Sequence, residues 1–412
     1  MHQLSRSRRQ AHIDHSALPR GVRLIAWARA VRWVGWGFGE ALIPIFIFLF
    51  SNTFAEAGLL RSTYEIASLL SLPLIGIWAD RVSAKRLILA SLLLYVFVGG
   101  SYFLAGLFGL AIFIVIARGL NGFIWELENM GVETYYRRMS DHRHVAASFG
   151  YIDTWSTFAW IAAALAGMFL LSFMPLHYLL FMIVPFTILA YFVAVRAPKD
   201  APRNSTAEKP SLLRSYRTAL AEWRTWSGHF WLLGSLILFS GVVSALMWFF
   251  IPIDAYIAGA NLPLVVLITV IGAIPSLFGY RLGKLADARN KYRLIAAGLI
   301  SVALVASGLA VFPQYAFKLF ASFLLGIILE LFYVAQSSLI TTMGSAETYG
   351  RRGSAFESVN VLGNLAAPLA LGIGLDTLGF TSVVAIVAGT ALVLGLCYAS
   401  MKIKVHPTAP KN

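Results

Sequence analysis

The stretch GIWADRVSAKR, residues 76–86, is a polar and basic turn between two long apolar runs, and it recurs once. The second copy, GKLADARNKYR at residues 283–293, repeats the Gly-x-x-Ala-Asp core. Gly76 and Gly283 are 207 positions apart, and so are Asp80 and Asp287, which is about half of the 412-residue chain. Two halves that carry the same loop after their second apolar segment are typical of secondary transporters built from two pseudo-symmetric bundles.

The composition indicates that most of the chain is solvated by lipid. Hydrophobic residues make up 58% and charged residues 13% of the sequence, whereas a soluble domain carries about 25% charged residues. A helix needs about 20 apolar residues to cross a hydrocarbon core about 30 Å thick. We therefore expect an all-α polytopic membrane protein with twelve transmembrane helices, near residues 31–50, 57–79, 87–106, 110–136, 146–171, 176–195, 229–251, 262–282, 293–312, 315–343, 354–375 and 380–401.

Both copies of the loop resemble the loop between helices 2 and 3 of the major facilitator superfamily, which reads Gly-x-x-x-Asp-Arg/Lys-x-Gly-x-Arg/Lys-Arg/Lys. The first copy has Ser83 in place of the second glycine and matches at Gly76, Asp80, Arg81, Lys85 and Arg86. The second copy has Ala288 in place of the basic residue after the aspartate and matches at Gly283, Asp287, Lys291 and Arg293. The resemblance implies two pseudo-symmetric six-helix bundles and leaves the substrate open.

The positive charge lies on one side of the expected topology. The formal net charge is +14, and only Arg61, Arg118 and Lys318 fall away from that side. The asymmetry places both termini and the central linker in the cytoplasm, and we expect a bacterial inner (plasma) membrane. Anionic lipids account for the basic balance without nucleic acid. The Lys and Arg clusters lie at residues 6–32, 81–86, 137–143, 196–224, 281–293 and 351–352 and in the C-terminal tail.

A polar, proline-broken linker separates the two halves. Residues 24–33 mix arginines with tryptophans and aliphatic residues, so we expect this segment to lie along the membrane surface. The sequence then divides into a basic cytoplasmic tail with an interfacial helix (1–30), an N-terminal bundle (31–195), a cytoplasmic linker with an amphipathic helix (196–228), a C-terminal bundle (229–401) and a cytoplasmic tail (402–412).

A second repeat marks the inner ends of helices 4 and 10. ETYYRRMS at residues 133–140 and ETYGRRGS at residues 347–354 agree at six of eight positions. The resemblance implies that charges at these places hold the cytoplasmic side shut in one state. Asp80 and Asp287 are expected near the N-termini of helices 11 and 5, where the positive end of the helix dipole favours an anion. The alternative is ordinary interfacial charge. The expected cytoplasmic gate comprises Gly76, Asp80, Arg81, Lys85, Arg86, Glu133, Arg137, Gly283, Asp287, Lys291, Arg293, Glu347 and Arg351.

Polar residues inside the spans are costly and therefore candidates for function. Those we expect in a transport cavity that couples to protons are Glu40, Arg118, Asn121, Glu126, Asp153, Glu330 and Asn360. Positions 118, 122, 126, 129 and 133 form one stripe at helical spacing. The segment from Arg118 to Gly122 resembles the superfamily's helix-4 pattern of Arg, amide and Gly, which implies a part in proton transfer. The set is net acidic, which favours cations or protons.

Glu40 and Arg118 are expected to face one cavity and to relieve each other's cost of burial. Protonation of Glu40 would then free Arg118, which offers a route from proton binding to helix movement. A static ion pair that fixes helix register is the alternative. Trp36, Trp125 and Trp248 either stack on a solute or serve as packing residues, and the same holds for Trp155.

The sequence favours a carrier over an enzyme. It contains no nucleotide-binding loop and no nucleophile with a partner base, and Cys397 is its one cysteine. We expect a secondary active transporter that moves a small organic solute by alternating access with proton coupling. Its expected partners are that solute, protons and the lipid bilayer, in a monomer without cofactor or metal.

Two alternatives stay open. A proton-driven multidrug or metabolite efflux antiporter is disfavoured by the helix-5 stretch FAWIAAALAG, residues 158–167, which lacks the glycine-proline pattern of such exporters. A non-transporting sensor or lipid-handling protein with the same fold would bind a ligand without moving it.

Overall fold

The computed structural model describes residues 18–139, 145–200, 228–342 and 349–401, and these ranges contain helices and no strands. The N-terminal half comprises α1 (Arg20–Glu40), α2 (Ile43–Leu49), α3 (Phe54–Arg81), α4 (Ala84–Phe108), α5 (Ile112–Met139), α6 (Val145–Leu170), α7 (Leu176–Phe181) and α8 (Ile183–Val195). The C-terminal half comprises α10 (Gly228–Ala245), η3 (Leu246–Phe250), α11 (Ile251–Ile257), α12 (Leu262–Ala273), η4 (Ile274–Phe278), α13 (Gly279–Ala288), α14 (Lys291–Val311), α15 (Tyr315–Thr342) and α16 (Tyr349–Ser400). The all-α membrane fold predicted from the sequence is confirmed.

The helices fit the twelve expected spans. Within the described residues, six helical segments are long and apolar enough to cross a membrane, and the pair α1–α2, bent by 44°, makes seven. Expected spans also coincide with α3, α5 and α6, which are long but more polar, and with the shorter apolar run through α12 and η4. The long α16 contains the last two spans, which join at Gly379. Its φ of 77° and ψ of 166° define a backbone conformation that only glycine adopts readily.

Short polar residues define several helix starts. The Thr53 side chain accepts a hydrogen bond from the backbone N–H of Glu56 at the start of α3, and the Asn261 side chain does so from Leu264 at the start of α12. Asn290 caps α14 in the same way. Such caps satisfy amide groups that a helix leaves unpaired at its first turn.

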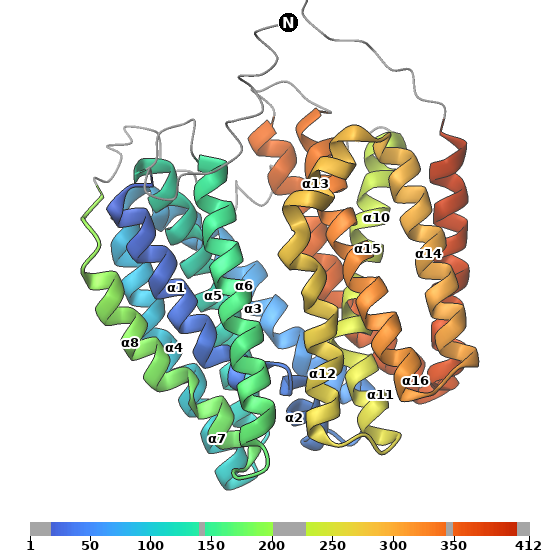
Figure 1. The fold of residues 1–412 in the computed structure, drawn as a ribbon, viewed down its shortest axis with the longest axis horizontal. Helices are drawn as coiled ribbons and strands as arrows, with labels where there is room; N and C mark the ends of the chain where they lie inside the picture. The colour runs from blue at the N-terminus through green and yellow to red at the C-terminus, as the bar shows by residue number, and fades with distance from the viewer. Residues whose placement is uncertain (1–17, 140–144, 201–227, 343–348, 402–412) are drawn as a thin grey trace, which may run out of the picture.

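The two halves stand side by side, with the start of α1 and the end of α16 at one end of the molecule and α2, α7 and α11 at the other (Figure 1). The halves meet where α3 packs on α16, α6 on α12, and α2 on α11. A Cβ added at Gly58 or Gly372 would collide with the backbone carbonyl of Pro368 or Phe54. The backbones of α3 and α16 therefore touch directly, as small residues allow in membranes.

Polar contacts tie the same interface together. The Asp376 carboxylate on α16 accepts hydrogen bonds from the backbone N–H groups of Phe54 at 2.9 Å and Ala55 at 2.8 Å, at the start of α3. The Ser62 hydroxyl donates to the backbone carbonyl of Leu365 at 2.8 Å. We call this contact region, where the N-terminal part of α3 packs on α16, the α3–α16 seal.

The first helix begins earlier than expected. Helix α1 starts at Arg20, and Val22, Ile25 and Ala28 are buried against α4, α5 and α8 instead of lying along a membrane surface. The segment 24–33 looked interfacial because of its arginines, but Arg32 is only 1% exposed. The expected linker helix and both terminal tails lie largely or wholly outside the described residues.

Candidate functional site

A cavity of about 810 Å³ lies between the halves and is lined by both of them. A second pocket of about 300 Å³, which we call the side pocket, is lined entirely by the C-terminal half. The two spaces share the lining residues Ser244, Trp248, Ala273, Ser276, Glu330 and Tyr333, so they lie next to each other. A drug-sized solute fits a space of this size.

The two walls of the cavity differ in charge. Three arginines and three carboxylates are among the described lining residues, namely Arg29, Arg61, Arg118, Glu40, Asp153 and Glu330. Only Glu330 belongs to the C-terminal half. The expected acidic excess is therefore wrong, because Arg29 and Arg61 also line the cavity and Glu126 does not.

The side pocket is lined by Glu330 and by a set of neutral hydroxyl and amide groups. The neutral groups are Ser240, Ser244, Ser276, Gln336, Asn360 and Asn364. Some of them also contact one another, since Gln336 Nε2 donates to Ser240 Oγ at 2.9 Å and Asn364 Nδ2 donates to Asn360 Oδ1 at 3.3 Å. Hydroxyl and amide groups both donate and accept hydrogen bonds, which suits a hydroxylated solute.

Glu40 and Arg118 both line the cavity but do not form the expected ion pair. The Glu40 carboxylate accepts a hydrogen bond from Trp160 Nε1 at 2.7 Å. Arg118 Nη2 donates to the backbone carbonyl of Arg61 at 3.4 Å, and its guanidinium lies 4.8 Å from the centre of the Tyr64 ring. Each group thus has a partner that the sequence analysis did not assign.

The remaining cavity candidates divide into two groups. Asp153 and Glu330 line the cavity, and Asn360 lines the side pocket. Asn121 is buried, and Glu126 accepts a hydrogen bond from Ser68 Oγ at 2.7 Å, without lining either space.

Close packing of α5 on α3 explains this division. A Cβ at Gly122 would collide with the backbone carbonyl of Tyr64 on α3. The predicted polar stripe of α5 therefore faces α3 at this level, and Arg118 is its one expected cavity residue that lines the cavity.

A buried ion pair in the N-terminal half was missed by the sequence analysis. Arg32 Nε lies 3.0 Å from Glu128 Oε1, and the two side chains are 1% and 2% exposed. The Arg32 guanidinium lies over the rings of Trp33 and Tyr95, at 4.5 and 5.0 Å from their centres. Arg32 was counted with the basic tail. Placing it in the first membrane span would have predicted a buried carboxylate partner, because a buried arginine needs one.

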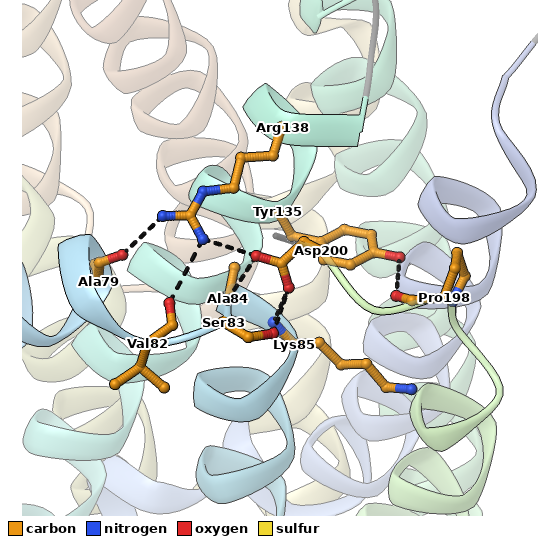
Figure 2. Close-up of polar contacts among 9 residues, drawn as sticks. All are labelled: Ala79, Val82, Ser83, Ala84, Lys85, Tyr135, Arg138, Pro198 and Asp200. Carbon is orange, nitrogen blue, oxygen red and sulfur yellow. Dashed lines mark hydrogen bonds and ion pairs between the residues drawn. The ribbon is translucent and has the colours of Figure 1, made fainter. Parts of the chain in front are cut away.

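The loop between α3 and α4 is held by a residue of the linker, Asp200 (Figure 2). Its carboxylate accepts hydrogen bonds from the Ser83 hydroxyl at 2.5 Å and from the backbone N–H groups of Ala84 at 2.9 Å and Lys85 at 3.0 Å. Arg138 Nη1 donates to the same carboxylate at 2.7 Å. We call this group the Asp200 bracket, and it fixes the loop to the end of α5.

The bracket stabilises the charged form of Asp200. Burial raises the pKa of its carboxyl, but the hydrogen bonds from Lys85, Ser83, Arg138 and Ala84 outweigh burial and hold the pKa at about 2. Lys85 Nζ also donates to the carbonyls of Val195 and Ala197, at 2.6 and 2.5 Å. The loop, the end of α5 and the start of the linker are thereby connected within one half.

The expected gate residues form no ion pair between the halves among the described side chains. Glu133 pairs with Arg137 one turn later on the same helix. The other described gate residues make no hydrogen bond or ion pair to the opposite half. They are Gly76, Arg81, Lys85, Arg86, Gly283, Lys291 and Arg293. The side chains of Asp80, Asp287 and Arg351 and all of Glu347 lie outside the described residues.

Comparison with known proteins places these observations in context. The family model described as Major Facilitator Superfamily matches residues 26–319. No curated protein sequence matches the chain.

Solved structures resemble the fold over nearly its full length. A mutant of the nucleoside transporter NupG has a TM-score of 0.76 and 16% identity, covering 93% of this chain and 100% of that chain. The non-mutant NupG structure has a TM-score of 0.73, with the same identity and coverage. A D-xylose–proton symporter has a TM-score of 0.72 and 14% identity, covering 92% of this chain and 97% of that chain. At such identities the likeness concerns the fold alone.

Proposed function

Because this chain belongs to the Major Facilitator Superfamily, a family of secondary transporters, we propose that it moves a small organic solute across the membrane by alternating access. The observation that carries the proposal is the cavity between the halves, which both halves line. Rocking of two bundles about a central site exposes that site to each side in turn. The solute would bind in the cavity and be carried as the halves change their angle.

The orientation follows from the charge of the loops. The basic loops 81–86 and 281–293 belong on the cytoplasmic side by the positive-inside rule. The α3–α16 seal lies at the opposite end of α3 from the first of these loops, so we assign it to the outer face. In this orientation the structure corresponds to the inward-facing state. We assign the protein to a bacterial inner membrane, with both termini in the cytoplasm.

The cytoplasmic gate would form when the halves rock to the outward-facing state. We propose that Glu133, Arg137 and the charged residues of the two loops then pair between the halves. The Asp200 bracket keeps the first loop and the end of α5 together, so that this part of the N-terminal half moves as a unit.

Proton coupling is the energy source that the cavity supports best. Glu40, Asp153 and Glu330 place three carboxylates in its lining, and an intramembrane carboxylate that faces a cavity is suited to carry a proton. We assign the coupling role first to Glu40, because it shares the cavity wall with Arg61 and Arg118 and has its own anchor in Trp160. Protonation would remove one negative charge beside these arginines.

The chemistry of the side pocket suggests a hydroxylated solute. Its serines, asparagines and glutamine match solutes rich in hydroxyl groups. The two proteins named in the structural comparison, a nucleoside transporter and a D-xylose–proton symporter, are consistent with this class.

Flux into liposomes tests the proposal. Purified protein would be reconstituted and supplied with radiolabelled sugars, sugar acids, nucleosides and amino acids under an imposed pH gradient. We expect at least one hydroxylated solute to accumulate and a protonophore to abolish the accumulation. Absence of protein-dependent flux for every solute would contradict the proposal, and binding without flux would support the sensor alternative.

A further inference from the structure

Arg118 is a buried cation with unmet hydrogen-bonding capacity in the wall of the cavity. Its residue is 5% exposed, and its Nε has no hydrogen-bond partner among the residues that the structure describes. The guanidinium has five N–H donors, and the one hydrogen bond found for it is the long contact to the Arg61 carbonyl at 3.4 Å. Burying such a group without a partner is costly, so the site is suited to an acceptor that arrives from the cavity.

The neighbouring charges are already engaged. Arg61 Nη1 lies 3.6 Å from Glu65 Oε1, one turn along the same helix. Glu40 accepts the Trp160 hydrogen bond, and no described carboxylate oxygen lies within 4.0 Å of an Arg118 nitrogen. Arg29 also has no carboxylate partner, but it donates to Asn129 Oδ1 at 2.9 Å. Arg118 is therefore the arginine of this wall that has neither an ion pair nor a short hydrogen bond.

Two tryptophan rings of the N-terminal wall are poor sites for an organic cation. The guanidinium groups of Arg29 and Arg32 lie over the rings of Trp125 and Trp33, at 5.7 and 4.5 Å from their centres. These two faces thus already carry positive charge from the protein, and a cationic solute would be repelled there. The N-terminal wall therefore favours an anionic over a cationic solute.

We propose that the transported solute is a hydroxylated monocarboxylate, such as a sugar acid, which the cavity binds at two points. The carboxylate accepts hydrogen bonds from Arg118, and the hydroxyl groups bind the hydroxyl and amide side chains of the side pocket around Gln336 and Asn360. The inference rests on the proposed transport function and names the substrate class of the same cavity.

The charge of the wall favours a solute with one negative charge. The lining contains as many carboxylates as arginines. Arg29 donates to Asn129 and Arg61 lies beside Glu65, whereas the hydrogen bond of Arg118 is a long one, at 3.4 Å. A dianion such as a phosphate monoester would bring a second charge without a second arginine that lacks a short contact, at a cost that rises in a low-dielectric site. A neutral sugar would leave Arg118 unsatisfied, so it is expected to bind more weakly than its acid.

Binding to matched pairs of solutes tests the substrate class. The pairs are D-glucuronate with D-glucose, D-galacturonate with D-galactose, and D-gluconate with D-glucitol, and D-glucose 6-phosphate serves as the dianion. Thermal shift and titration calorimetry would be run on the purified full-length protein. At least one acid should bind, with its neutral partner and the phosphate about 10- to 100-fold weaker.

Variants locate the carboxylate. Arg118→Gln should weaken binding of the acid about 10- to 100-fold, and Asn360→Ala about 2- to 10-fold, because a charged hydrogen bond contributes more than a neutral one. Arg196→Gln removes one exposed positive charge away from the cavity and should leave binding unchanged. The melting temperature of each variant without solute shows whether it still folds. Arg118→Lys keeps the positive charge and serves as a second control.

The two proposals fail in different ways. If a neutral sugar binds as tightly as its acid, or if the acid binds Arg118→Gln as tightly as the unmodified protein, the carboxylate site is refuted while transport stands. If liposomes accumulate an amino acid or nucleoside and no acid of the panel binds, the substrate class is also refuted. If no solute moves at all, the transport function itself is refuted.

Discussion

The two halves of this protein share a loop but differ in the wall that they present to the cavity. The N-terminal wall carries Arg29, Arg61, Arg118, Glu40 and Asp153, whereas the C-terminal wall carries Glu330 and a set of hydroxyl and amide groups. The repeated Gly-x-x-Ala-Asp loop lies at an end of α3 and of α13, and its residues line neither space. The two halves therefore share a repeated loop, whereas one wall is a charged surface and the other is mainly a hydrogen-bonding surface.

This difference suggests a division of labour. Charged groups buried in a membrane are costly, so they are retained where a proton or an ion must be bound. Neutral polar groups recognise the shape and hydroxyl pattern of a solute at lower cost. The following predictions test whether the halves differ as this account requires.

The largest expected effect comes from the buried ion pair of the N-terminal half. Arg32→Ala leaves Glu128 buried without its partner, which should cost about 3–5 kcal/mol of stability. Breaking the pair between Lys318 and Asp254 in the C-terminal half should cost less, because Asp254 is 24% exposed and can be hydrated. Thermal unfolding of Arg32→Ala and Lys318→Ala in one detergent measures the difference.

A double variant separates the loss of the ion pair from the loss of packing at this site. Arg32→Met with Glu128→Leu removes both charges, so it should recover much of the lost stability. Equal destabilisation by Arg32→Ala and Lys318→Ala would show that the halves do not differ in the cost of their buried charges.

The α3–α16 seal gives the next effect. Gly58→Val places a side chain where the Pro368 carbonyl now lies, so it should disfavour the closed outer side by about 1–3 kcal/mol. Gly119→Ala is the matched control, because nothing lies within 4 Å of a Cβ at that position. The measurement uses Thr154→Cys in a Cys397→Ser background, which places a thiol in the cavity lining. An external thiol reagent should label it faster in Gly58→Val and at an unchanged rate in Gly119→Ala.

The carboxylates of the two walls should differ in coupling. Coupling to one proton drives about tenfold accumulation of solute per unit of pH gradient. Glu40→Gln should abolish this accumulation while exchange of solute across the membrane continues. Glu330→Gln on the other wall should keep the accumulation. Loss of coupling in Glu330→Gln alone would place the proton on the C-terminal wall instead.

The smallest expected effect is at the Asp200 bracket. The pKa of Asp200 is about 2 in the folded protein and about 3.9 in an unfolded chain. A lowered folded pKa means that its contribution is complete above pH about 4 and is lost as the pH falls towards about 2. We expect a contribution on the order of 1 kcal/mol, because solvent partly screens the charge.

Asp200→Asn should remove that contribution. The difference in melting temperature between the variant and the unmodified protein should be largest above pH 4 and shrink on acidification. A difference that grows as the pH falls would contradict the assignment of the charge.

The sequence predicted the fold well, because the repeated loop and the polar residues inside apolar runs are local signals. It predicted four charged residues of the cavity lining, namely Glu40, Arg118, Asp153 and Glu330. It assigned Arg29 to the cytoplasmic tail, and it named Arg61 only as a cation away from the cytoplasmic side. Both arginines were therefore left out of the charge count of the cavity.

Other contacts depend on tertiary structure that no local pattern encodes. Asp200 belongs to a polar linker stretch that resembles solvated chain, but it meets the loop after α3 because the end of α8 lies beside that loop. The bond between Glu40 and Trp160 joins residues 120 positions apart. Spacing along one helix cannot predict such pairs, since they depend on how helices from different parts of the chain pack.

Cross-linking the outer closure tests the central claim most directly. Ser62→Cys and Leu365→Cys, in a Cys397→Ser background, place two thiols across the contact between α3 and α16. A short bifunctional thiol reagent should lock the halves, so that solute still binds from the cytoplasmic side while flux into liposomes stops. Flux that continues at an unchanged rate after complete cross-linking would contradict alternating access between the two halves.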